Sequence, residues 1–129
     1  MLLGKATPDD YNIHPSKYPW AKDLYDQAVR NTWFPHEIAL KEDLDDWTKM
    51  TDDERHAVEF LISFFNPSEL IINRVLSLGV YPYLKSAECH LYLAKQMWEE
   101  ANHCVAFEYV LDTFPPLSWT TIACANSGI

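Results

Sequence analysis

The sequence predicts an all-α fold, a helical bundle of about three helices, and three observations support this. Apolar residues recur with helical spacing in three stretches of the chain. The last two stretches are long and joined by short links, which is typical of antiparallel bundle packing. No alternating run or hairpin turn signal indicates a strand. A chain of 129 residues is long enough for one domain with a modest core.

The first helix is expected to follow an irregular arm. Residues 1–17 contain two prolines and show no periodicity. Pro19 fits the first turn of a helix, and Pro35 sets its limit. The apolar face of this helix consists of Ala21, Leu24, Tyr25, Ala28 and Val29. The acidic stretch Glu37–Trp47 that follows is interpreted as a connection.

The second helix has a clear predicted start. Thr51 and Glu54 form a capping-box pattern, which marks the beginning of a helix. The helical spacing continues to Leu78, and Gly79 is expected to end the helix. Because Pro67 lies inside it, we expect a kink or a local distortion there.

The third helix is predicted over Ser86–Phe114, and Pro115-Pro116 is expected to end it. Residues 18–116 would then form the helical domain. Residues 117–129 carry no charge and no helical period. We interpret this tail as atypical, the result of a truncation or a reading-frame change.

Composition excludes several classes of protein. The net charge of −9 argues against nucleic-acid binding, which needs a basic surface. The run Phe60–Leu78 is interrupted by polar and charged residues, so it is not a membrane span. The start of the chain lacks the apolar region of a signal peptide. The three cysteines form no disulfide or zinc pattern, and we expect a soluble, cytoplasmic protein (Cys89, Cys104 and Cys124).

The third helix carries a candidate metal motif. Glu100 and His103 are three residues apart, so they project from one side of the helix, in or beside its apolar stripe. A carboxylate that faces a core is costly unless it is paired or bound to metal. Glu-x-x-His on a long helix is the dimetal motif of ferritin-like bundles, and its ligands suit iron or manganese. A single such motif is also common as a surface pair or a satisfied core histidine.

The second helix repeats this pattern. Glu69 occupies a position where the helical period predicts an apolar residue. Two inward acids and one inward histidine on adjacent long helices favour a metal site. The alternative for Glu69 is that Pro67 shifts the helical face and turns the carboxylate to solvent.

Other aromatic and histidine residues have ordinary interpretations. Taken alone, each of three tryptophans is expected to be a packing residue (Trp33, Trp47 and Trp98). Four histidines have no helical ligand partner and are interpreted as surface or structural residues (His14, His36, His56 and His90).

Four segments in order resemble the small subunits of ribonucleotide reductase. Trp33–Ile38 reads W-F-P-H-E-I and resembles the W-x-P-x-E-[IV] element of that family. Thr51–His56 reads T-D-D-E-R-H and resembles the family's S-x-x-E-[RK] helix opening. Phe64–Glu69 fits the segment of the first carboxylate ligand, and Trp98–His103 fits the helix with the second carboxylate and the first histidine. The resemblance covers Tyr18–Phe114 and implies a ferritin-like dimetal fold, present here as its N-terminal part.

The resemblance also implies residue roles. Glu69 would be a ligand of one metal, Glu100 would bridge two metals, and His103 would bind the same metal as Glu69. Trp33 matches the tryptophan that passes an electron between the dimetal site and the large subunit. The implied function is generation of the radical that starts reduction of ribonucleotides to deoxyribonucleotides in that large subunit.

Phe107 is an informative departure from the family pattern. Most members have a tyrosine there, four residues after the histidine, and it holds the stable radical. Phenylalanine has no phenolic hydroxyl, so the resemblance is to the subgroup that stores the oxidising equivalent on a manganese/iron pair rather than beside a di-iron pair. Glu69, where tyrosyl-radical members usually have aspartate, fits the same subgroup. Ligand-binding oxidases built on the same fold are the alternative.

The resemblance further implies parts that we expect to be missing from this chain. The family has two more carboxylate ligands, a second histidine and a C-terminal tail that docks on the large subunit. Members are homodimers that pair with the large subunit. This chain is therefore expected to supply half of a dimetal site. A third possibility is an inactive helical fragment whose uncovered apolar faces favour aggregation or dimer formation.

Overall fold

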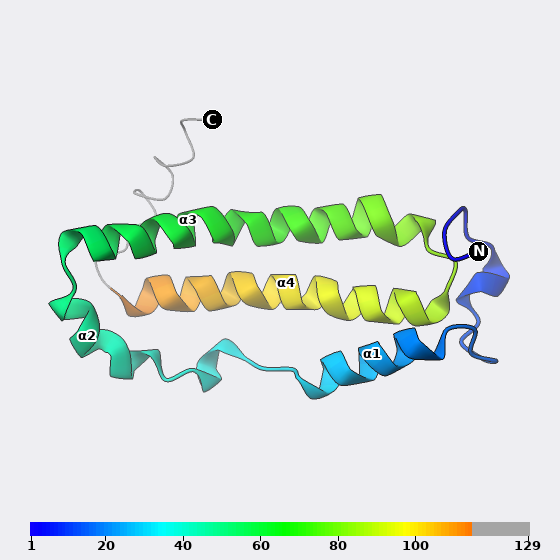
Figure 1. Cartoon of the computed structure of the whole chain (residues 1–129), viewed down its shortest axis with the longest axis horizontal. Coiled ribbons are helices and arrows are strands. Elements are labelled where there is room, and N and C mark those ends of the chain that lie inside the picture. The colour runs from blue at the N-terminus through cyan, green and yellow to red at the C-terminus, as the bar shows by residue number, and fades with distance from the viewer. Residues whose placement is uncertain (115–129) are drawn as a thin grey trace. The chain divides into compact units, whose positions relative to one another are not determined.

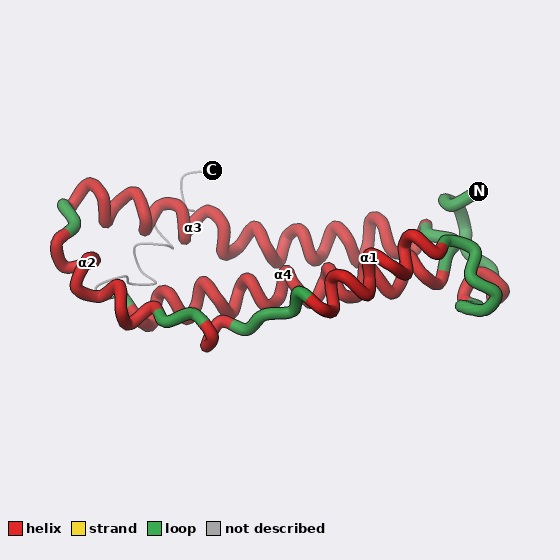
Figure 2. The backbone as a smooth tube through the Cα atoms, turned by 60° about the horizontal axis from the view of Figure 1, so that its bottom comes forward, coloured by secondary structure: helices red, strands yellow, loops and turns green. Residues whose placement is uncertain are grey.

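The computed structural model describes residues 1–114, and helices dominate them (Figure 2). The described residues form four α-helices: α1 (Pro19–Arg30), α2 (Leu44–Lys49), α3 (Asp52–Val75) and α4 (Ala87–Thr113). Short 3-10 turns cover Pro8–Tyr11, Pro35–Glu37, Leu40–Asp43 and Tyr81–Tyr83. Leu3 and Leu84 form an isolated antiparallel β-bridge. The predicted all-α class is confirmed.

The structure differs from the sequence prediction at two places. The short helix α2 forms inside and just beyond the stretch interpreted as a connection, because its buried Trp47 packs against Phe114 with ring centroids 5.2 Å apart. The α-helical part of α3 ends at Val75, and a π-helical turn continues over Leu76–Val80. Gly79, the predicted stop, therefore lies inside that turn. The helical segment runs through Pro67, and the kink or distortion expected there stays a prediction.

The N-terminal arm differs from its prediction, and the C-terminal end lies outside the described residues. The arm predicted to be irregular contains the turn Pro8–Tyr11. The predicted stop at Pro115-Pro116 and the tail 117–129 lie outside the described residues.

The chain divides into two compact units. The first combines residues 1–33 with 71–101, and the second combines residues 34–70 with the chain from residue 102 onward. The core of the first unit is formed by buried apolar residues from α1, the α3–α4 connection and α4: Ala21, Leu84, Cys89 and Leu93. This core fixes the N-terminal arm and α1 against the start of α4.

A buried carboxylate secures the same arm. Glu88, in the first turn of α4, is 1% exposed. Its Oε1 accepts hydrogen bonds from the Ser16 hydroxyl at 2.7 Å and from two backbone N–H groups, and its Oε2 accepts one from the Ser86 hydroxyl. Burial raises the pKa of Glu88, but hydrogen bonds led by that from Ser16 outweigh it and lower the pKa from 4.5 to about 2.

In the second unit the front part of α3 lies beside the last part of α4 (Figure 1). The rings of Phe65 and Phe107 stack with an interplanar angle of 6° and centroids 6.4 Å apart. Tyr109 of α4 donates its hydroxyl to the backbone carbonyl of Ile38 at 3.2 Å. The Phe65–Phe107 contact holds the part of α3 that carries Glu69 next to the part of α4 that carries His103, and the Tyr109 bond fixes the stretch after the turn Pro35–Glu37 to α4.

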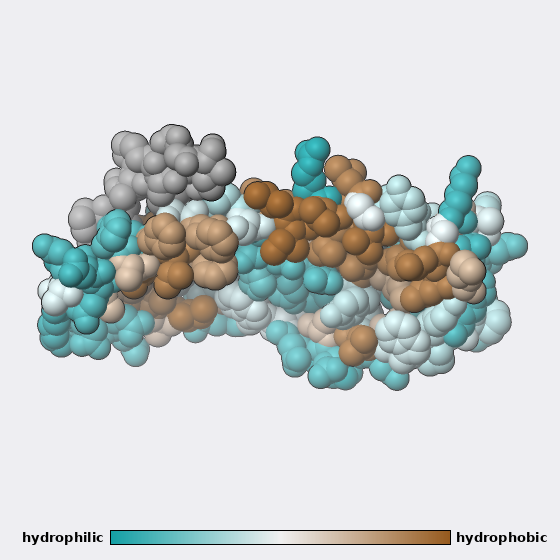
Figure 3. Space-filling model, turned by 45° about the horizontal axis from the view of Figure 1, so that its top comes forward, coloured by the Kyte–Doolittle hydropathy of each residue, from teal (hydrophilic) through white to brown (hydrophobic). Residues whose placement is uncertain are grey.

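The helix α3 also exposes a row of large apolar side chains. Apolar side chains gather over α3 on the face shown in Figure 3. The most exposed large apolar residues of this helix are Phe60, Phe64, Leu70 and Ile71, with exposed fractions between 58% and 61%. No described helix is long and apolar enough to cross a membrane.

Candidate metal centre

The acid of α3 and the histidine of α4 meet in the second unit. Oε2 of Glu69 lies 3.3 Å from Nδ1 of His103. The Glu69 side chain is 13% exposed and that of His103 is 38% exposed. Pro67 therefore does not turn Glu69 to solvent, and the alternative interpretation of this residue is wrong.

Glu100 lies close to this pair because it is on the same helix as His103. It lies one helical turn before His103 and is 8% exposed. Each of Glu69, Glu100 and His103 offers one ligand atom, and these atoms all lie within 4.8 Å of one another. The three residues selected from the sequence as candidate ligands therefore form one cluster.

The donor set fits a divalent metal. Carboxylate oxygens and an imidazole nitrogen are the donors that iron and manganese accept. Gathering two acids around one site, with one of them buried, is unfavourable without a compensating positive charge. A metal ion supplies that charge, and a histidine supplies it only while protonated. The cluster can therefore hold a metal, with three ligands from two helices.

The surroundings of the cluster are apolar on one side. Phe107 follows His103 by one turn and is half-buried against Phe65. Cys104 donates its thiol to the backbone carbonyl of Asn66 at 3.6 Å. The position that holds a tyrosine in most members of the resembled family therefore holds a ring without a phenolic hydroxyl.

The other residues selected from the sequence lie elsewhere. Trp33 is half-buried in the extended stretch between α1 and the turn Pro35–Glu37. His90 is 6% exposed, and its ring packs against Tyr11 and Tyr81, in line with a structural role.

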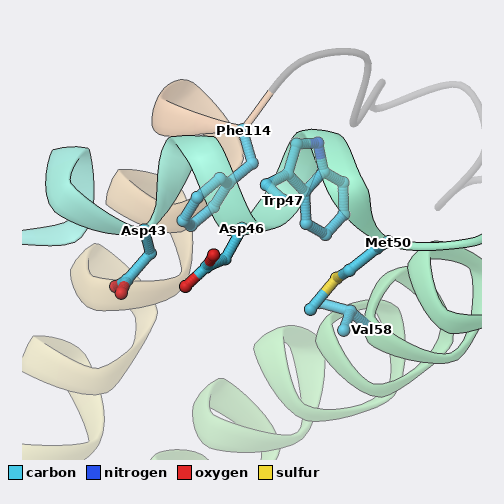
Figure 4. Close-up of a pocket in the computed structure, with 6 residues that line it drawn as sticks. All are labelled: Asp43, Asp46, Trp47, Met50, Val58 and Phe114. Carbon is cyan, nitrogen blue, oxygen red and sulfur yellow. The ribbon is translucent and has the colours of Figure 1, made fainter.

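An apolar cavity of about 260 Å³ lies in the second unit (Figure 4). Trp47, Met50 and Val58 line it, together with Asp43, Asp46 and Phe114. A second cavity of about 260 Å³ in the first unit has lining residues from Leu2 to Leu93. Neither lining includes Glu69, Glu100 or His103.

Two residues near this framework escaped the sequence reasoning. Asn73 reaches from α3 to the backbone of α4, and Glu88 anchors the N-terminal arm. A signal for Asn73 was its spacing of four residues after Glu69, which places both on one face of α3. The signal for Glu88 was Ser86, whose hydroxyl accepts from the backbone N–H of Cys89 as a helix cap.

Comparison with known proteins finds the same family by family model and by individual relatives. The protein-family model described as "Ribonucleotide reductase, small chain" matches residues 10–121. The ribonucleoside-diphosphate reductase small chain of Swinepox virus (strain Kasza) is 31% identical over 102 residues, covering 79% of this chain and 37% of the relative. The subunit beta of Chlamydia pneumoniae is 29% identical over 107 residues, covering 81% of this chain and 31% of the relative.

Solved structures show the same similarity. The ribonucleotide reductase R2 subunit from Clostridium botulinum aligns with a TM-score of 0.77 and 32% identity, over 88% of this chain and 36% of that chain. The Rnr4 homodimer from Saccharomyces cerevisiae aligns with a TM-score of 0.78 over 84% of this chain and 35% of that chain. Its 20% identity supports the fold alone. This chain spans about a third of the length of these relatives.

Proposed function

Because this chain belongs to the ribonucleotide reductase small-chain family, we propose that it is part of the radical-generating subunit of a ribonucleoside-diphosphate reductase. The cluster of Glu69, Glu100 and His103 is the observation that carries the proposal. A dimetal centre in such a subunit supplies oxygen activation and a one-electron oxidant. The large subunit would use that oxidant to begin ribonucleotide reduction.

The residues of this chain have distinct parts in the proposal. Glu69 and His103 would bind one metal from facing helices, and their donor atoms, 3.3 Å apart, already have a separation that suits two ligands of one ion. Glu100, on α4 one turn before His103, would be the ligand shared with the second metal. The two carboxylates offset the positive charge of the ions in a partly buried site. Trp33 carries an electron between this site and the large subunit.

Phe107 favours a manganese/iron centre over a di-iron centre. Its ring lacks a phenolic hydroxyl and stacks on Phe65, so this position cannot hold a tyrosyl radical. In the proposal the oxidising equivalent is therefore kept on the metals.

The proposal includes partners. The whole small subunit pairs with the reductase large subunit and forms a homodimer, and the yeast structure is itself described as a homodimer. The exposed apolar row of α3 is a surface that other parts of such an assembly would cover. Because the chain spans about a third of its relatives, the remaining ligands would have to come from outside the described residues.

Two other functions remain as competitors. A ligand-binding oxidase on the same fold would need an apolar chamber at the metals. An inactive helical fragment would keep its helix content with no dependence on metal. The cluster favours a metal-binding subunit over the inactive fragment, because its two acids and histidine are a donor set that an ion fits. The match to the ribonucleotide reductase small-chain family favours the reductase subunit over the oxidase.

Metal uptake tests the proposal. The full chain is loaded anaerobically with Mn(II) and Fe(II), and bound metal is measured after removal of free ions. We expect stoichiometric metal in the wild type and its loss in Glu100→Ala, because the variant removes the bridging ligand. Glu108→Ala is the matched control, since Glu108 lies on α4 but is exposed.

The alternative outcomes separate the hypotheses. Metal that is retained in Glu100→Ala would place binding elsewhere on the acidic surface. A wild type that folds but takes up no metal would make this chain an inactive fragment, and the reductase role would describe only its family.

A further inference from the structure

A side chain of α3 is hydrogen-bonded to the backbone of α4 inside the first unit. The amide Nδ2 of Asn73 donates to the carbonyl of Met97 at 2.7 Å. Both residues are half-buried. A backbone carbonyl has two lone pairs, so Met97 can accept this bond in addition to its bond within the helix. The contact therefore joins the two helices without disturbing either ladder.

The contact lies one turn from candidate ligands on both helices. Asn73 follows Glu69 by four residues on α3, and Met97 precedes Glu100 by three residues on α4. Residues at these spacings share a helical face. The bond thus joins two turns: the turn of α3 that follows Glu69, and the turn of α4 that leads to Glu100.

This part of α3 needs such a tie because its own ladder is irregular on both sides. Pro67 has no N–H and cannot donate to the carbonyl four residues earlier. The α-helical ladder ends at Val75, where the π-helical turn Leu76–Val80 begins. A change from α-helical to π-helical hydrogen bonding alters which side chains share a face of the helix, so a contact next to the change fixes the orientation of that face. Asn73 lies two residues before that change.

The neighbouring interhelical contacts are weaker. In the second unit, the thiol of Cys104 reaches the carbonyl of Asn66 at 3.6 Å, and a thiol is a weak donor. A metal bound by Glu69 and His103 would replace the hydrogen bond between them. The Asn73 bond involves no proposed ligand and can persist in the metal-bound protein.

We infer that Asn73 is a positioning residue of the metal centre, which fixes the phase of α3 after Glu69 and holds the Glu100 turn of α4 against it. This inference rests on the proposed function, since it concerns the ligands of that centre. Asn73 acts through the backbone and does not bind metal itself. Groups that orient ligands in this way contribute about 10–100-fold to metal affinity.

Mn(II) binding to the full chain, followed by electron paramagnetic resonance, tests this role. Asn73→Ala removes the donor but favours a helix. We expect its Mn(II) affinity to fall about 10–100-fold and the line width of its bound Mn(II) signal to change. Ser77→Ala is the matched control, because the Ser77 hydroxyl donates to the carbonyl of Arg74 within the same segment. Its affinity and line width should equal those of the wild type.

A second variant keeps the test decisive. Asn73→Gln retains an amide donor and should bind Mn(II) more tightly than Asn73→Ala. Equal Mn(II) affinity and line width in wild type and Asn73→Ala would overturn the positioning role. So would a drop in unfolding free energy alone, measured with urea, because that result describes an ordinary packing contact. If the wild type takes up no Mn(II), the proposed function fails first, and the positioning role fails with it.

Discussion

Two buried glutamates on α4 show how differently the same side chain can be used. Glu88 is 1% exposed and Glu100 is 8% exposed. Glu88 is surrounded by hydroxyl and backbone donors from the N-terminal arm and the helix cap. Glu100 is gathered instead with a second carboxylate and an imidazole. Burial alone therefore does not distinguish a structural acid from a metal ligand.

The difference lies in what compensates the negative charge. At Glu88 the protein supplies donors, and the result is a pKa lowered to about 2. Around Glu100 the protein adds another acid, which increases the negative charge. The donors around Glu88 stabilise its anion directly, whereas two acids gathered with a histidine form a donor set that a divalent cation fits.

The largest expected effect is the loss of metal in Glu100→Gln. The substitution keeps the volume of the side chain and removes the charged donor. We expect stoichiometric Mn(II) binding to disappear while the free energy of unfolding of the metal-free chain stays within about 1 kcal/mol of the wild type. Metal analysis and urea unfolding check the two parts. A variant that keeps its metal would remove the distinction between the two glutamates.

Glu88→Gln should show the opposite behaviour. Glutamine offers one acceptor oxygen, and its NH2 group meets donors, so the anchor of the arm is broken. We expect the free energy of unfolding at neutral pH to fall by about 3 kcal/mol, the value that corresponds to the lowered pKa. Urea unfolding measures this loss. Folded Glu88→Gln should still take up Mn(II), and a specific loss of metal there would contradict the comparison.

The pH dependence of stability should isolate the same carboxylate. Because the folded pKa of Glu88 is lowered from 4.5 to about 2, its contribution is complete above pH 4.5 and is lost as pH falls toward 2. The unfolding free energy of the wild type should therefore decrease over that window more steeply than that of Glu88→Gln. Parallel curves for the two proteins would argue against the lowered pKa.

Ser16→Ala is expected to give the smallest effect. It removes one hydroxyl donor, which lies 2.7 Å from Oε1 of Glu88, and leaves the backbone donors in place. A hydrogen bond to a charged group contributes about 1.5–3 kcal/mol, so we expect a loss near the lower end. The pKa of Glu88 should rise, which carbon-13 NMR of its carboxyl can follow. An unchanged pKa would mean that the backbone donors alone stabilise the anion.

The sequence predicted the long helices and the candidate ligands on them because both depend on local spacing. The start of α3 follows from the Thr51–Glu54 pair, whose hydrogen bonds are present in the structure. The shared face of Glu100 and His103 follows from their separation of three residues. The family and the all-α fold were also predicted, from motifs in a fixed order.

What escaped prediction depends on tertiary contacts. The short helix α2 is stabilised by the packing of Trp47 on Phe114, far along the chain. The π-helical turn at Leu76–Val80 has no sequence signature comparable to a cap or a proline. The orientation of Glu69 was open because Pro67 could have shifted the helical face. In each case the deciding partner lies outside the local sequence.

The most direct test of the metal centre is electron spin echo spectroscopy of Mn(II) bound to the full chain with nitrogen-15 in its histidines. The account predicts a nitrogen coupling typical of a directly bound imidazole, which disappears in His103→Gln and persists in His56→Gln, whose histidine is exposed. A coupling that survives in His103→Gln, or bound Mn(II) with no histidine nitrogen in the wild type, would contradict the assignment of Glu69, Glu100 and His103 as one metal site.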